Sequence, residues 1–403
     1  MVAPMAPGVL DVSTVRARRA RVAVAAQFLT NGALFANLLP RFPEIKTDLA
    51  LSNAPYGLTI AAFSAGAFVA GLTAAALIRR FRSARVAVGG TVAIAVFVFA
   101  AGLAPSAVPV AGALFLAGAS DAVTDVAQNA HALRVQRIYG RSIINSVHAV
   151  WAGGAVLGGL MGAGAIALHI PRPVHLGVAA VVFTGVALVA YRFMLPGADR
   201  DGHPASMHAQ GERAGRKVYL VLVAMAVIAI AGAMVEDAGS SWATLYLRDS
   251  IGAPGGIAAF GYIALAAFMF VGRLIGDRLV DRFGETAVAR AGGALAAAGM
   301  GAALAFPSVA ATIAGFAAAG LGVATAIPAA MHGADQLPGL RPGTGLTIVT
   351  WLLRIGFLAS PPLVGVIADW TSLRIGLLTV PVAGLVIMVL AGALSVRGRP
   401  VRS

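Results

Sequence analysis

The sequence predicts an all-α membrane protein of twelve transmembrane helices, arranged as two six-helix halves. Three observations support this fold class. The 403 residues are 59% hydrophobic and only 11% charged, which is far less charge than soluble domains carry. Apolar runs of membrane-spanning length recur along the chain, and a single long hydrophilic stretch divides them. With 49 Gly and few aromatic residues, the apolar surface should allow close helix packing.

Apolar runs of roughly 18 to 25 residues are long enough to cross a bilayer as helices. In the first half they lie near 20–39, 55–77, 86–104, 108–133, 143–167 and 175–194. In the second half they lie near 218–238, 256–279, 288–306, 309–333, 344–367 and 375–395. No cleavage pattern follows the first run, so we expect it to stay as a span. The predicted division is a first half 1–195, a cytoplasmic linker 196–217 and a second half 218–403.

Basic residues gather at one end of the predicted spans. With the N-terminus inside, the inner segments hold 23 of the 30 Lys and Arg residues and the outer segments hold 5. Because basic loops stay on the cytoplasmic side, we expect a multi-pass protein of the cytoplasmic (inner) membrane with both termini in the cytoplasm. The net charge of +14 then reflects topology, and we expect no nucleic-acid partner.

A spacing of 202 residues recurs between the halves. It relates three pairs of positions: Arg80-Phe81 and Arg282-Phe283, Gly118 and Gly320, and Gly154 and Gly356. A constant offset near half of the chain length predicts two parallel repeats around a central cavity.

The residue types exclude several kinds of chemistry. The chain has no Cys, so disulfides, thiol catalysis and Cys-based metal sites are ruled out. No catalytic cluster or metal-ligand spacing is visible either. We therefore expect no enzyme, no cofactor and no metal. The expected partners are a small-molecule substrate, protons and the lipid bilayer, and we expect a monomer.

Acidic side chains in the fourth span predict a proton-coupling site. Asp121, Asp125 and Asn129 follow one another at four-residue intervals, which places them along one helix face. Charges inside spans are costly in lipid and mark interior, functional positions. A carboxyl group facing a partly dehydrated cavity can bind a proton on one side of the membrane and release it on the other. We predict this role for Asp125, with Asp121 as a second acid. The alternative is a structural partner for an arginine on another helix.

Other polar residues inside the spans predict a substrate-binding set. The fifth span carries Asn145, His148 and Trp151 at three-residue spacing, and the first carries Gln27 and Asn31 four residues apart. Such side chains can bind hydroxyl or amide groups of a solute, and they can also hold helices together. The predicted set is Gln27, Asn31, Asn129, Asn145, His148, Trp151 and Arg354.

Arg354 lies inside the eleventh span, where its charge needs a match from Glu236, Asp237, Asp121 or Asp125. A ligand-binding role for this arginine favours an anionic or hydroxyl-rich substrate. Glu236 and Asp237, near the outer end of the seventh span, form either an outer gate or an interfacial helix end.

A charged turn after the eighth span predicts a conformational latch. Its residues are Asp277, Asp281, Arg282 and Gly284. Opposite charges at a short turn can hold one helix to its neighbours in one state and release it in another. The first-half counterpart, Leu77 to Arg82, lacks the acid, which weakens the case for a latch there.

The twelve spans, the central linker and the Asp281-Arg282-Phe283-Gly284 turn resemble the major facilitator superfamily over nearly the whole chain. Within it, the segment Asp125-Val126-Ala127-Gln128-Asn129 and the stretch from Arg141 to Gly154 resemble the fucose:proton symporter branch. The resemblance implies a secondary active transporter that works by alternating access. It also implies that the acid couples protons to sugar movement and that Asn145 and His148 contact the sugar.

Departures from that branch keep other functions open. Ala130 replaces a usual Pro, His148 replaces an amide, and the first span lacks a further acid. Four glycines of the fifth span resemble the antiporter motif of drug exporters, although its Pro is missing: Gly154, Gly158, Gly159 and Gly162. The alternatives are a proton-driven multidrug or metabolite exporter and a non-transporting membrane sensor.

Overall fold

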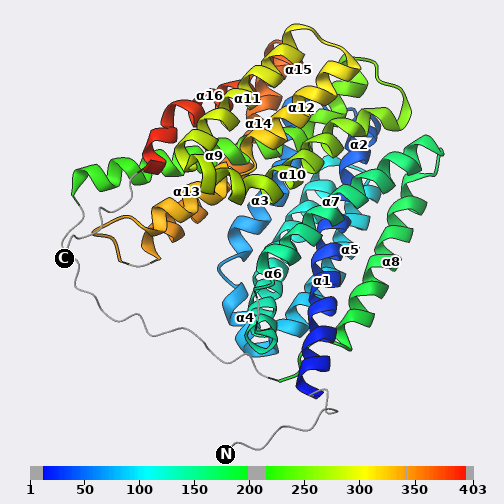
Figure 1. Cartoon of the computed structure of the whole chain (residues 1–403). Coiled ribbons are helices and arrows are strands. Elements are labelled where there is room, and N and C mark those ends of the chain that lie inside the picture. Colours follow the sequence, from blue (N-terminus) through cyan, green and yellow to red (C-terminus); the bar gives the residue numbers. More distant parts are fainter. Residues whose placement is uncertain (1–11, 141, 198–214, 342, 396–403) are drawn as a thin grey trace, which may run out of the picture.

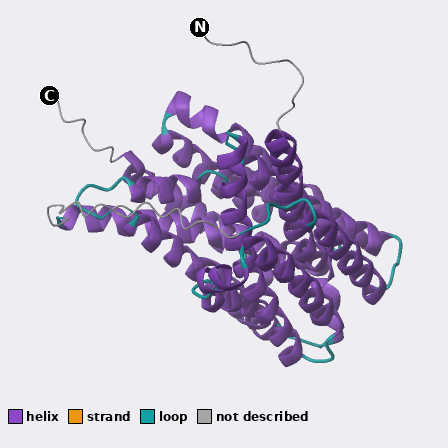
Figure 2. Ribbon diagram, turned by 90° about the horizontal axis from the view of Figure 1, so that it is seen from below, coloured by secondary structure: helices purple, strands orange, loops and turns teal. Residues whose placement is uncertain are grey.

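The computed structural model describes residues 12–140, 142–197, 215–341 and 343–395. Helices make up nearly all of this described part, which contains no strand (Figure 2). It holds eleven helices long and apolar enough to cross a membrane, or twelve when one bent pair is counted as a single span. The predicted all-α architecture of membrane-spanning helices is therefore confirmed.

The first half begins with α1 (Val12–Leu38), which continues through η1 (Leu39–Arg41) into α2 (Phe42–Asp48). The remaining helices are α3 (Asn53–Ala70), α4 (Ala74–Phe81), α5 (Ser83–Leu103), α6 (Ala107–Tyr139), α7 (Ile144–Ala167) and α8 (Arg172–Tyr191). Each predicted run has its helix. The second span differs from a straight helix, since α3 and α4 are bent by 61°.

The second half consists of α9 (Arg216–Leu245), η2 (Tyr246–Ser250), η3 (Gly255–Ala259), α10 (Phe260–Phe283), α11 (Glu285–Ala305), α12 (Val309–Val323), α13 (Ala326–Asp335), α14 (Thr344–Trp370), α15 (Leu373–Gly376), α16 (Thr379–Leu390) and η4 (Ala391–Ser395). Here the tenth predicted span is divided between α12 and α13, and the twelfth between α15, α16 and η4. Most of the predicted linker, residues 198–214, lies outside the described residues.

Equivalent glycines make equivalent contacts in the two halves. A Cβ at Gly118 of α6 would collide with the carbonyl oxygen of Phe63 in α3, and a Cβ at Gly320 of α12 would collide with that of Leu265 in α10. Both glycines and both contacted residues are 202 positions apart. The absence of a side chain therefore allows the same close helix crossing twice.

An arginine repeats in the same way at the start of the last span of each half. Nε of Arg172 donates to the carbonyl oxygen of Gly102 (2.7 Å), and Nε of Arg374 donates to that of Leu304 (2.6 Å). Both bonds satisfy a carbonyl at a helix C-terminus, which has no partner within its own helix. The two halves therefore share side-chain contacts as well as helix order.

The halves meet at the end of the bundle where α3 begins and α14 ends, here called the closed end. Asp369 accepts hydrogen bonds from the backbone N–H groups of Asn53 and Ala54 (2.8 Å each). The Tyr56 hydroxyl donates to the carbonyl oxygen of Ser241 (2.8 Å). Among the described residues, every hydrogen bond that joins the halves lies between the middle of the bundle and this end.

The opposite end is where α1, α5 and α9 begin, and it carries most of the described arginines; it is called the arginine-rich end. Here the helices of the two halves diverge, and Figure 1 shows α4 and α13 well apart. The bend before α4 contributes to this divergence because it turns α4 away from the line of α3. The bundle is thus joined at one end and spread at the other.

The collision at Gly118 predicts that Gly118→Ala lowers the free energy of unfolding by about 1–3 kcal/mol, because α3 and α6 must move apart. The measurement is thermal or denaturant unfolding in a neutral detergent, followed by helical circular dichroism. Gly112→Ala on the same helix is the control, since nothing lies within 4 Å of a Cβ there. Equal effects of the two substitutions would contradict the proposed crossing.

Candidate functional site

A cavity of about 400 Å³ lies between the two halves, with walls from α1, α3, α6 and α7 on one side and α9, α10 and α14 on the other. The polar and charged residues that line it are Asn31, Ser64, Asp121, Asp125, Trp151, Glu236, Asp237, Ser240, Ser241, Tyr262, Arg273, Thr350 and Arg354. Apolar side chains fill the rest of the wall, including Phe35, Phe63, Leu353 and Phe357. Such an apolar cavity with a few convergent polar groups is the usual form of a small-molecule site.

One hydrogen-bond chain links three helices and ends on Asp121. Nε1 of Trp151 in α7 donates to Oδ1 of Asn31 in α1 (2.8 Å), and Nδ2 of Asn31 donates to Oδ1 of Asp121 in α6 (2.9 Å). The packing of α1 on α7 makes this reach possible, because a Cβ at Gly32 would collide with the carbonyl oxygen of Trp151. Asn31 is thereby fixed in orientation, since both ends of its amide are used.

A second chain, one turn further along α6, ends on Asp125. Nδ2 of Asn129 donates to Oδ1 of Asp125 (3.0 Å), while Oδ1 of Asn129 lies 3.0 Å from Nε2 of His148 in α7. Because that amide oxygen can only accept, Nε2 of His148 must carry a hydrogen in this arrangement. The edge of the Phe28 ring meets the imidazole, with 5.1 Å between ring centroids. Asp125 itself is exposed to the cavity.

Arg354 approaches the cavity from α14 in the second half. Its Nη1 donates to the carbonyl oxygen of Ala67 in α3 (2.8 Å), at the point where a Cβ on Gly71 would lie 3.0 Å from the guanidinium. Within the described residues this arginine forms no ion pair, although it interacts electrostatically with both Asp121 and Asp125. Its direct partner is thus a backbone carbonyl, whereas the sequence suggested a carboxylate.

Sequence reasoning missed a charge pair on the second-half wall. Nη2 of Arg273 in α10 lies 3.7 Å from Oε2 of Glu236 in α9. The next residue, Asp237, is buried, and its Oδ1 accepts a hydrogen bond from Oγ of Ser241 (3.3 Å). Its Oδ2 has no hydrogen-bond partner within the described part of the chain. The signal for the pair was present, because Arg273 and Arg354 are the two basic residues that lie well inside predicted spans and away from their ends.

Gln27 lies away from the cavity, in contrast to the predicted binding set. It is fully buried, its Nε2 donates to the carbonyl oxygen of Ala187 in α8 (2.8 Å), and its Oε1 accepts from Thr91 of α5 (3.4 Å). These bonds hold three helices together, so we do not carry Gln27 into the proposed site. Asn129 and His148 do not line the cavity, and hydrogen bonds link them to Asp125, which does. The side chain of Asn145 lies outside the described ones.

The predicted latch residues lie at the arginine-rich end, where α10 ends. Asp277, Asp281 and Arg282 are exposed, and no ion pair of the described residues includes them. The guanidinium of Arg282 stands over the ring of Phe283 at 5.3 Å. In this state the charges are not engaged with a neighbouring helix, and a role for them as a latch stays a prediction.

The Major Facilitator Superfamily model matches residues 24–334, so this chain belongs to that superfamily. An uncharacterized transporter, y4wD, of Sinorhizobium fredii is 29% identical over 371 residues, which cover 92% of this chain and 97% of that protein. The predicted superfamily is confirmed. The chain is a multi-pass membrane protein of a transporter family and not an enzyme.

Solved structures show the same fold. A bacterial homologue of the human lysosomal transporter Spinster, in an inward-facing and occupied conformation, aligns with a TM-score of 0.72 at 14% identity, over 93% of this chain and 95% of that one. FucP in the outward conformation aligns with a TM-score of 0.59 at 18% identity, over 94% of this chain and 99% of that one. Both alignments cover nearly the whole of each chain, so they show a shared fold.

The turn before α5 predicts a stabilising substitution. Arg82 has φ +74°, and its counterpart 202 positions later, Gly284, has φ +82°. Only glycine adopts such a conformation without steric cost. We therefore expect Arg82→Gly to raise the free energy of unfolding by about 1 kcal/mol, measured in neutral detergent. Arg80→Gly, inside α4, should instead lower it by about 1 kcal/mol, and a stabilisation of equal size there would contradict the explanation.

Proposed function

We propose that this protein is a proton-coupled secondary transporter of a small, polar, sugar-like solute. It works by alternating access across the cytoplasmic membrane, with the arginine-rich end and both termini in the cytoplasm. The observation that carries the proposal is the position of Asp121 and Asp125, which lie on the first-half wall of a cavity whose opposite wall holds Arg354. The division 1–195, 196–217 and 218–403 is part of the same proposal.

Attraction across the cavity gives the acids a way to control the two halves. When Asp121 and Asp125 are ionised, they attract Arg354 on the other half and favour closure of the arginine-rich end. When they are protonated, that attraction is lost and the cavity stays open toward the cytoplasm. Release of the proton there therefore prepares the empty carrier to return to the outward-facing state, which is the sequence of events that symport requires.

The composition of the cavity favours a hydroxyl-rich solute. Asn31, Ser240 and Thr350 offer hydrogen-bonding groups, and Oγ1 of Thr350 has no partner in the described part of the protein. The indole of Trp151 and the stacked rings of Phe35 and Phe63, 4.1 Å apart, supply flat apolar surfaces for the ring face of such a molecule. The resemblance to the fucose:proton symporter branch points to the same class.

Export through the same cavity is the alternative function. Its sequence support is the glycine series of the fifth span, but these glycines have a packing role. Cβ atoms at Gly154 and Gly158 would collide with backbone oxygens of α1, and one at Gly159 would lie 2.9 Å from the Tyr262 ring of the other half. Close packing at both interfaces explains the series without any export function.

The test uses proteoliposomes that contain a pH-sensitive dye, with a panel of sugars and of drug-like cations. For wild type we expect solute-dependent proton movement with a sugar-like solute, and for Asp125→Asn we expect its loss. Because Asn resembles the protonated acid, the variant should still exchange labelled solute between the two sides of the membrane. That exchange separates a loss of coupling from a loss of binding or folding.

The control is Asp249→Asn, at an exposed acid outside the cavity, which should retain proton movement. Unchanged proton movement in Asp125→Asn would remove Asp125 from the mechanism. Proton movement driven only by the cations would favour the exporter.

A further inference from the structure

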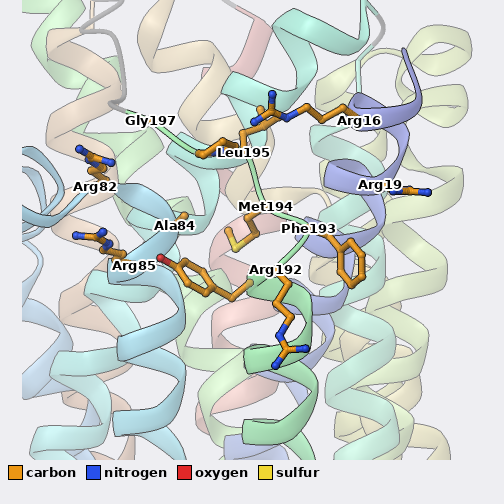
Figure 3. Close-up of a pocket in the computed structure, with 12 residues that line it drawn as sticks. Arg16, Arg19, Arg82, Ala84, Arg85, Arg192, Phe193, Met194, Leu195 and Gly197 are labelled. Atoms are coloured by element: carbon orange, nitrogen blue, oxygen red, sulfur yellow. The ribbon is translucent and has the colours of Figure 1, made fainter. Parts of the chain in front are cut away.

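A second cavity, of about 720 Å³, lies at the arginine-rich end of the first half, away from the proposed transport site. It is formed where α1 and α5 begin and α8 ends. Five arginines line it: Arg16, Arg19, Arg82, Arg85 and Arg192. Figure 3 shows Arg82 and Arg85 on one side and Arg16 and Arg19 on the other, with Arg192 and Phe193 between them. This group is called the arginine pocket.

The lining of the arginine pocket is positively charged. Among the residues that the structure describes, no acidic side chain belongs to it. Within the part of the chain that the structure describes, none of its five guanidinium groups forms an ion pair or a side-chain hydrogen bond. Five cations around one cavity repel one another unless an anion enters, so their field concentrates anions at this point.

Membrane topology explains part of this charge, because the first span usually dominates orientation. It does not explain why arginines from α1, from the start of α5 and from the end of α8 line one cavity. Residues of α1 correspond to second-half residues 201 positions later, as Leu29 corresponds to Ile230, and residues of the other helices correspond to positions 202 later. The second-half equivalents of the five arginines are therefore Lys217, Leu220, Gly284, Ala287 and Leu394. One cation stands there against five, so the pocket is a particular feature of the first half.

The surroundings of the pocket are apolar, as an amphipathic ligand requires. Tyr191 and Phe193 are exposed at its edge, while Met194 is buried at its base. Further along the helices, Val22 of α1 and Val189 of α8 are exposed (69% and 58%), and both helices are long and apolar enough to cross a membrane. Aromatic side chains at the level of lipid headgroups, with aliphatic ones below, match the profile of a phospholipid. A soluble phosphate would use only the guanidinium groups.

We propose that the arginine pocket binds the headgroup of an anionic phospholipid from the adjacent leaflet. Guanidinium groups pair with phosphate oxygens through two parallel hydrogen bonds, and basic pockets between transmembrane helices suit such headgroups. Because five cations exceed the charge of one phosphodiester, a headgroup with two phosphates fits best. The lipid holds α1, α5 and α8 together at the end where the halves are spread. This proposal does not depend on the transported solute.

The test counts bound lipids on the detergent-purified full-length protein by native mass spectrometry. The probes are cardiolipin, phosphatidylglycerol and phosphatidylcholine, with glycerol phosphate as the soluble competitor. We expect one tightly bound cardiolipin, weaker phosphatidylglycerol, and no retained phosphatidylcholine. One variant replaces four arginines of the pocket: Arg16→Gln/Arg19→Gln/Arg85→Gln/Arg192→Gln. Its affinity for cardiolipin should fall by about tenfold or more, and the single variant Arg85→Gln should show a smaller loss of affinity.

A matched control removes four exposed arginines of the same end that do not line the pocket: Arg79, Arg80, Arg137 and Arg278, each replaced by Gln. This control should keep the bound lipid, and circular dichroism should show that both variants are folded. Equal loss in the control would reduce the effect to general attraction and overturn the proposal. Displacement of cardiolipin by glycerol phosphate at similar concentration would identify a soluble anion as the ligand and overturn it as well.

Discussion

The electrostatic interaction across the central cavity is the constraint on which the rest of this structure depends. Two carboxyl groups of α6 and the guanidinium of Arg354 on α14 belong to different halves and share one cavity. Charged groups at membrane depth are too costly to face lipid, so they require a protein interior that supplies water or partners. The hydrogen-bond chains through Asn31 and Asn129 supply such partners to the acids. Arg354 obtains its own from a backbone carbonyl.

Close helix packing puts these groups in place. Glycines let α1 contact α7, α3 contact α6, and α3 contact α14 at backbone distance. The pairing of α3 with α14 extends from Asn53 and Asp369 at the closed end to Ala67 and Arg354 in the middle. Beyond Gly71 the chain bends into α4, and the halves diverge. A pair of helices that is fixed at one end and anchored in the middle by Arg354 is suited to a rocking motion of one half against the other.

The sequence predicted the spans, the repeat and the acid face of α6, because these depend on local patterns. Helical periodicity alone places Asp121, Asp125 and Asn129 on one face, and the cost of charge in lipid turns that face inward. The contact partners were harder to predict, since they depend on how helices rotate against one another. Gln27 faces α5 and α8, although it lies only one turn from Asn31 at the cavity.

Two further features escaped prediction for the same reason. The ion pair of Glu236 with Arg273 joins two spans whose relative rotation the sequence does not specify. The arginine pocket was interpreted as a topology signal, because Arg16, Arg82 and Arg192 are far apart in the chain and only the folded structure places them around one cavity. Charge counts along a sequence show which side of the membrane a segment faces, but not which arginines line the same cavity.

The most direct test of the central claim measures the opening of the arginine-rich end as a function of pH. Since the chain has no Cys, spin labels can be attached to cysteines introduced by Ile138→Cys on α6 and Leu279→Cys on α10. Double electron–electron resonance then gives the distance between the two labels, one on each half. Attraction across the cavity predicts a longer distance at low pH and a shift to shorter distances as the acids ionise. This shift should disappear in Asp121→Asn/Asp125→Asn and persist in Asp249→Asn. A distance distribution that is the same at every pH in the wild type, or a double variant that responds as the wild type does, would contradict the claim.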